Sequence, residues 1–215
     1  GIWEIRLMRI ITWNCPGEFD IDQFGSFDLF FVQRMCGSMV SNLHYHKNYI
    51  ENYSGRGICV VSKEEPEHIE SGKFSWYNET ADETQGKHWQ TFTTNNIKFI
   101  NALPSYPEDD GSITDENRIL QTSELLDLVD YNSVLVGDFH ENDNSLEEEI
   151  KLENRGLINH IKEGTFTCND GSMASIDKII TTKNSDIKIS NVTVIKYERE
   201  RLIGHWPISF DLEIS

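Results

Sequence analysis

Short apolar runs alternate with polar segments along the whole chain, and most of them have the length of a β-strand. DLFFVQ at 28–33 forms a continuous apolar run, which predicts a strand buried on both faces. HWQTFTT at 88–94 alternates with a period of two, as a half-buried strand does. We predict further strands at 8–13, 55–63, 72–78, 96–103, 134–139, 164–168, 175–182, 188–198 and 206–214.

Two segments between these runs have helical patterns. Residues 114–132 place apolar side chains close to a helical stripe, behind an acidic first turn. Residues 144–156 predict a second helix, with Ser145 and Glu148 as a capping box and Gly156 as the C-terminal stop. Strands in both halves of the chain, with helices between them, predict two packed β-sheets flanked by helices, an α/β sandwich.

The length of the chain fits one domain. Its 215 residues are enough to bury a substantial core without disulfide bonds. We place this domain at 8–215 and treat residues 1–7 as a remnant, either cloning-derived or from upstream, outside the fold. The segment 38–53 is either helical or irregular. No apolar run approaches the roughly 20 residues that a membrane span needs, so we expect no membrane association.

The four cysteines are scattered and form no C-x-x-C pair, and they lie at Cys15, Cys36, Cys59 and Cys168. This pattern predicts unbridged thiols in a reducing compartment, which makes the cytoplasm the expected location.

Charge restricts the partners more than any other bulk property. The formal net charge is −17 and the isoelectric point is near 4.7, so the chain repels DNA and RNA at long range. Lys and Arg cluster only at 196–201, where glutamates interrupt them. Tight, non-specific nucleic-acid binding is therefore disfavoured, and a basic protein partner becomes a plausible alternative.

Polar side chains gather where the predicted strands end. Asn14 follows the first strand and Arg34 follows the second. Asp138 and His140 end the strand in VLVGDFH, Asp177 lies within SIDKII, and His205 precedes the last strand. Each of these residues has an ordinary structural explanation when taken alone, but their order along the chain makes them a candidate site.

The same segments resemble the motifs of the endonuclease/exonuclease/phosphatase superfamily, the DNase I-like proteins, and especially its small bacterial members. The matching segments run from Met8 to Ile214 and are ITWNC, FDLFFVQRM, GRGICVVSK, VLVGDFH, SIDKII and GHWPISFDLEI. This resemblance implies a four-layer α/β sandwich with two mixed sheets. It also implies phosphodiester hydrolysis at a site containing Asn14, Asp138, the residue at 140, Asp177 and His205.

The chain departs from that family at several site positions. Arg34 stands where the family has its principal Mg²⁺-binding glutamate, His140 replaces an asparagine, and Gly204 replaces an aspartate. The FINALP segment also lacks a histidine that many members carry. Mg²⁺ prefers oxygen ligands, and a guanidinium at its position adds a repulsion of a few kcal/mol at about 4 Å. The usual Mg²⁺ site is therefore expected to be dismantled.

The retained residues leave two functions open. In the first, the fold persists as a non-catalytic binding or inhibitory module for a phosphate-containing ligand or a basic protein. In the second, the protein is a non-canonical phosphodiesterase or nuclease. Asp138 then accepts a proton from water, Asp177 orients His205, and Arg34 clamps phosphate.

Two details of the site also stay open. Arg34 either binds phosphate or closes the site through a salt bridge to Asp138. A softer ion, Mn²⁺ or Zn²⁺ rather than Mg²⁺, is conceivable on Asp138, His140 and His205, because imidazole suits such metals.

Overall fold

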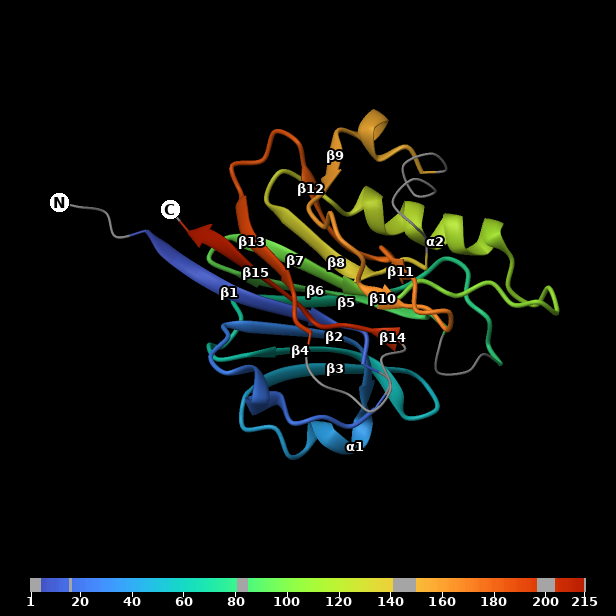
Figure 1. Ribbon diagram of the computed structural model, residues 1–215, viewed down its shortest axis with the longest axis horizontal. Coiled ribbons are helices and arrows are strands. Elements are labelled where there is room, and N and C mark those ends of the chain that lie inside the picture. Colours follow the sequence, from blue (N-terminus) through green and yellow to red (C-terminus); the bar gives the residue numbers. More distant parts are fainter. Residues whose placement is uncertain (1–4, 16, 81–84, 141–149, 197–203, 215) are drawn as a thin grey trace.

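Two six-stranded mixed β-sheets pack face to face in the computed structural model, which describes residues 5–15, 17–80, 85–140, 150–196 and 204–214 (Figure 1). The first sheet has the order β13-β15-β1-β2-β4-β3. Its strands are β1 (Arg6–Trp13), β2 (Leu29–Cys36), β3 (His46–Tyr53), β4 (Arg56–Ser62), β13 (Lys188–Val194) and β15 (Ile208–Ile214). Only β1 and β2 pair in parallel within it.

The second sheet has the order β5-β6-β7-β8-β12-β9, and its one parallel pair is β7 with β8. Its strands are β5 (His68–Lys73), β6 (His88–Thr94), β7 (Ile97–Ala102), β8 (Ser133–Asp138), β9 (Leu157–Asn159) and β12 (Asp177–Thr182). A small third sheet of β10 (Phe166–Thr167), β11 (Met173–Ala174) and β14 (Gly204–His205) lies at one end of the sandwich (Figure 1).

Short helices and loops complete the outer layers. The helix α2 (Asp115–Asp127) packs Leu125 and Leu126 against the outer face of the second sheet. The outer face of the first sheet is covered by the region of η1 (Ile21–Phe24) and α1 (Gly37–Val40). This arrangement confirms the predicted α/β sandwich, although helix contributes less than the sequence pattern suggested. No helix in the described part of the chain is long and apolar enough to cross a membrane.

The central core lies between the two sheets, and a second apolar layer lies outside each of them. In β2, Phe31 faces the central core and Phe30 faces the outer layer, and both are fully buried. The prediction that 28–33 is buried on both faces is therefore confirmed. Phe31 meets Phe99 of β7 across the sheet interface, with ring centroids 5.5 Å apart.

A buried polar bridge joins the sheets next to this aromatic pair. The Gln33 amide of β2 donates to Thr12 Oγ1 at 2.9 Å and to Asn101 Oδ1 of β7 at 3.0 Å. Asn101 in turn donates to Gln90 Oε1 at 2.8 Å. Because these buried groups must be paired with one another, they fix the register of one sheet against the other.

Several predicted boundaries were wrong. The strand expected at 72–78 runs instead from His68 to Lys73, where its register with β6 is complete. The first strand begins at Arg6 and pairs there with Ile214, so it extends into the segment that we placed outside the fold. The ambiguous segment 38–53 divides into α1 and β3.

The second predicted helix is only partly visible. Its first half, including the capping box at Ser145 and Glu148, falls outside the described residues. The described end forms the 3-10 helix η2 (Leu152–Arg155), which stops at Gly156 with φ 67°, in the left-handed conformation that favours glycine.

Truncation of Phe99 tests the packing between the sheets. Phe99 is fully buried, so Phe99→Ala is expected to lower the free energy of unfolding by about 3–5 kcal/mol, measured by urea denaturation. Leu120→Ala is the control, because Leu120 lies on α2 with 43% of its surface exposed, and its effect should stay below about 1 kcal/mol. A similar loss in both variants would contradict this description of the core.

Candidate functional site

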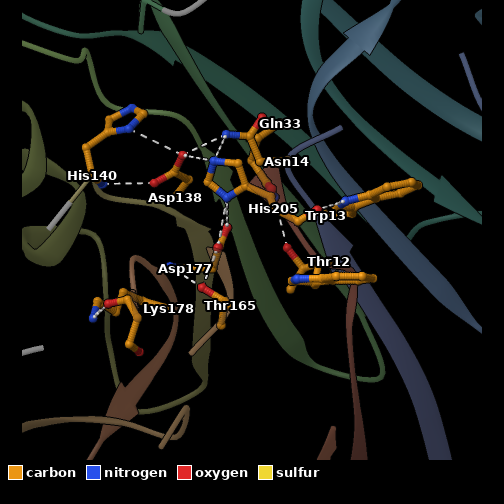
Figure 2. A network of polar contacts seen from close by, with 12 residues as sticks. Thr12, Trp13, Asn14, Gln33, Asp138, His140, Thr165, Asp177, Lys178 and His205 are labelled. Atoms are coloured by element: carbon orange, nitrogen blue, oxygen red, sulfur yellow. Dashed lines mark hydrogen bonds and ion pairs between the residues drawn. The ribbon is translucent and has the colours of Figure 1, made fainter. Parts of the chain in front are cut away.

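The ends of strands from all three sheets meet at one point, where the candidate residues lie together (Figure 2). Asn14 follows β1, Asp138 ends β8, and His205 belongs to β14. Asp177 begins β12 and pairs directly opposite Asp138 in the antiparallel register. The sequence motifs thus bring their polar residues to one place because the strands that carry them end on the same side of the sandwich.

Asp138 is the centre of the contacts. Its carboxylate is fully buried and accepts the Asn14 side-chain amide at 2.6 Å and the His140 backbone N–H at 2.9 Å. The oxygen that accepts from Asn14 is Oδ2 of Asp138. This atom also lies 3.2 Å from His205 Nε2 and 3.3 Å from His140 Nδ1. A buried carboxylate is costly unless charge and hydrogen bonds compensate it, and here donors surround it.

His205 connects the two carboxylates (Figure 2). Its Nδ1 lies 2.9 Å from Asp177 Oδ2, and its Nε2 faces Asp138. Thr165 donates to the same Asp177 oxygen at 2.6 Å. The backbone carbonyl of His205 accepts the Trp13 indole N–H at 3.1 Å. His205 is therefore held by its backbone to the first sheet and by its ring to the second.

These contacts favour a charged His205 and an ionised Asp138. Burial alone lowers the pKa of His205, but Asp177 and Asp138 outweigh it, and the pKa is raised above its usual range. Burial raises the pKa of Asp138, yet the His140 and His205 rings, the His140 N–H and the Asn14 amide together hold that pKa below its usual range. An imidazolium between two carboxylates is the arrangement that the distances support.

His140 has a different environment. Its backbone has φ 59°, a left-handed conformation that is uncommon for residues other than glycine and marks a constrained position. The ring Nε2 lies 2.9 Å from the Pro104 carbonyl oxygen, and the ring packs edge-on against Tyr106. Burial lowers the pKa of His140 despite the opposing effect of Asp138.

Arg34 reaches the cluster through Asn14. Its Nε donates to Asn14 Oδ1 at 2.7 Å, and Asn14 then donates to Asp138. Among the described contacts, no ion pair joins Arg34 directly to Asp138. The expectation of a salt bridge that closes the site is therefore wrong, because the Asn14 side chain lies between the two charges.

A pocket of about 410 Å³ opens over this cluster. One part of its lining is polar and consists of Asn14, Arg34, His140 and His205. The described lining contains no Asp or Glu side chain, because Asp138 and Asp177 are 0% and 3% exposed and lie behind the histidines. Among the described lining residues, the side chain that carries a permanent charge is therefore the Arg34 guanidinium.

The described residues do not fit a resident Mg²⁺ ion. Asp138, Asp177 and His205 have possible ligand atoms within 4.8 Å of one another, but both His205 nitrogens already face the two carboxylates. In the alternative trio of Asp138, His140 and His205, the His205 nitrogens have the same difficulty. The His140 Nε2 contacts the Pro104 carbonyl oxygen, so only Nδ1 of that ring faces Asp138. A guanidinium in the pocket wall opposes any cation there.

Sequence reasoning missed the residues that support the site. Thr165 fixes Asp177, Phe166 packs edge-on against the His205 ring at 4.8 Å, and Tyr106 packs against His140. Thr165 and Phe166 lie in the predicted strand at 164–168. The sequence thus predicted their local structure but not that they lie next to Asp177 and His205. Tyr106 lies in a Pro-flanked loop whose position no local pattern indicates.

Removal of the Asp177 charge tests the protonation of His205. Asp177→Asn should lower the pKa of His205, observed as a shift in the NMR titration of its imidazole, because the largest charge partner of the ring is lost.

The stability that this pair contributes is fully present below a pH of about 6.5 and is lost as the pH rises through the raised pKa of His205. The stability difference between the variant and the natural protein should therefore shrink over that range. Asp127→Asn on α2 is the control, and an unchanged His205 titration in Asp177→Asn would contradict the pairing.

Comparison with known proteins agrees on the fold. No protein-family model and no curated sequence matches the chain. Among solved structures, an endonuclease/exonuclease/phosphatase family protein from Leptotrichia buccalis has a TM-score of 0.65 at 15% identity, over 95% of this chain and 99% of that one. The 3′ phosphatase NExo from Neisseria, bound to a product DNA hairpin, gives 0.65 at 16% over 94% and 98%.

A third similar structure is ANGEL2, a 2′,3′-cyclic phosphatase, with a TM-score of 0.68 at 11% identity over 98% of this chain and 96% of that one. Identities this low establish architecture and leave the chemistry open. The chain has the endonuclease/exonuclease/phosphatase, DNase I-like fold, as its sequence motifs predicted.

Proposed function

We propose that this protein is a non-catalytic module that binds the phosphate group of its ligand. The observation that carries the proposal is the order of charges at the pocket. Arg34 and His205 line it, whereas Asp138 and Asp177 lie buried behind them. The fold is shared with nucleases and phosphatases, so a phosphate group is the anion that this position suggests.

The cations at the pocket support phosphate binding. The Arg34 guanidinium forms charge-assisted hydrogen bonds with phosphate oxygens, which are about twice as strong as neutral ones. Both His205 ring nitrogens face carboxylates, so His205 contributes positive charge rather than a hydrogen bond to the phosphate. The Asn14 side chain ties Arg34 to Asp138 and so holds the guanidinium at the pocket wall. The pKa of His205 is raised, because Asp177 and Asp138 outweigh the effect of burial, and this favours the charged form of the ring.

The state of Asp138 argues against hydrolysis. A general base must reach the water that it activates. Asp138 is fully buried, and contacts from Asn14, His140 and His205 already occupy its oxygens. The described pocket lining also lacks the carboxylates that a hydrolytic Mg²⁺ would need.

The net charge limits the classes of ligand and partner that the protein can bind. At −17 the protein repels long polyanions, so we propose a small phosphate-containing ligand or a basic protein rather than nucleic acid. A basic partner would make the module inhibitory. All four cysteines are free, as predicted, which fits the proposed cytoplasmic location.

A second function, metal-independent phosphodiester hydrolysis, is favoured by one specific feature. The Asp177–His205 pair has the geometry of a general acid held in its charged form, with 2.9 Å between Nδ1 and the carboxylate. In that case His205 protonates the leaving oxygen, and Asp138 must become accessible to water through displacement of Asn14 or His140.

Phosphate affinity tests the proposed binding. Inorganic phosphate should bind one site by isothermal titration calorimetry in EDTA, and Arg34→Ala should weaken it at least about tenfold, because a charge-assisted contact is lost. Arg6→Ala is the matched control, since Arg6 is an exposed arginine paired with Glu64. Equal affinities in the two variants, or no phosphate binding by the natural protein, would rule out this pocket.

Measurements of phosphoester hydrolysis distinguish the non-catalytic function from the hydrolytic one. Purified protein should hydrolyse neither p-nitrophenyl phosphate nor bis-p-nitrophenyl phosphate above the level of a His205→Gln variant, in Mg²⁺, Mn²⁺ or EDTA. The second function predicts turnover in EDTA that His205→Gln abolishes. That turnover would fall as the pH rises through the raised pKa of His205, where the ring loses the proton that it must donate.

A further inference from the structure

The rest of the described pocket lining is mostly apolar. Besides its four polar residues, the pocket is lined by Leu103, Tyr106, Phe166, Cys168, Ala174 and Ile176. Tyr106 is 52% exposed, although it is a large aromatic side chain. An exposed apolar wall beside a cluster of donors is typical of sites that bind a small molecule with one polar end.

Two aromatic rings stand next to the two histidines. Tyr106 lies edge-on to His140 with ring centroids 5.2 Å apart, and Phe166 lies edge-on to His205 at 4.8 Å. A phosphate held by Arg34 beside the His205 ring shares the pocket with both aromatic side chains. The organic group of a phosphate ester in this pocket can therefore pack against them.

Hydrogen bonds hold the backbone of Tyr106 in place. Its backbone N–H donates to Gln85 Oε1 at 3.0 Å, and the preceding Ser105 N–H donates to the fully buried Gln121 Oε1 at 2.6 Å. The next carbonyl back, that of Pro104, lies 2.9 Å from the His140 ring nitrogen. Because the backbone is already ordered, less conformational freedom is lost when a ligand packs against Tyr106, which favours affinity.

We propose that this pocket selects a small phosphomonoester whose organic group is an aromatic ring, with Tyr106 as a specificity-determining residue. The proposal rests on the phosphate binding proposed above and adds the class of ligand. Flat aromatic groups pack well against Tyr106 and Phe166 in offset or edge-on geometry.

The size and charge of the site exclude longer ligands. A volume of about 410 Å³ holds one small organic group together with its phosphate. Arg34 is the one arginine or lysine among the described lining residues, which matches a ligand with a single phosphate. With a net charge of −17 on the whole protein, a polyanion gains nothing beyond the first phosphate.

Calorimetry with three probes tests this selectivity. Phenyl phosphate should bind at least about tenfold more tightly than inorganic phosphate, because burial of the ring adds apolar contact. Methyl phosphate should bind about as tightly as inorganic phosphate. Tyr106→Ala should bring the ratio of phenyl phosphate affinity to inorganic phosphate affinity close to one. Tyr131→Ala, a change at a tyrosine that is 46% exposed and lies outside the pocket lining, should leave that ratio unchanged.

The outcomes distinguish this proposal from the one on which it rests. Failure of inorganic phosphate to bind would overturn the phosphate site itself. The aromatic selectivity alone would be overturned if inorganic phosphate binds but phenyl phosphate binds no more tightly. It would also be overturned if the higher affinity for phenyl phosphate survives both Tyr106→Ala and Phe166→Leu. A 5′-phosphorylated thymidine decamer that binds as tightly as phenyl phosphate at physiological salt would also overturn it, because the pocket would then accept a polyanion.

Discussion

The burial of two carboxylates at the meeting point of three sheets is the constraint that shapes this end of the molecule. Asp138 and Asp177 face each other in paired strands, and neither is exposed enough for water to stabilise its charge. The His205 ring stands between them and supplies the compensating charge. Because His205 comes from the third sheet and Asn14 from the first, stabilisation of these charges also ties the three sheets together.

The same constraint determines what the pocket presents to a ligand. In a metal-dependent site the carboxylates would face the cavity and share a cation. Here they face a histidine and an asparagine, while Arg34 stands in the cavity wall. A guanidinium repels divalent cations and attracts phosphate, and on this ground we propose that the site prefers an anion to a metal ion.

The sequence predicted the parts of this arrangement that depend on local order. Apolar runs in the sequence predicted the buried strands and the polar residues at their ends, such as Asp138. The order of these motifs along the chain indicated the fold. The parts set by distant contacts were not predictable. The extent of β5 depends on its register with β6, the place of Tyr106 depends on Gln85 and Gln121, and the insertion of Asn14 between Arg34 and Asp138 depends on the packing of both sheets.

We propose that the site holds an anion where the resemblance to the endonuclease/exonuclease/phosphatase superfamily implies Mg²⁺. Crystals grown with both Mn²⁺ and phosphate, with diffraction measured at the manganese absorption edge, test it most directly. We predict phosphate density in contact with Arg34 and His205 and no anomalous peak within coordination distance of Asp138. A manganese peak between Asn14 and Asp138, with Arg34 turned away from the pocket, would contradict the account.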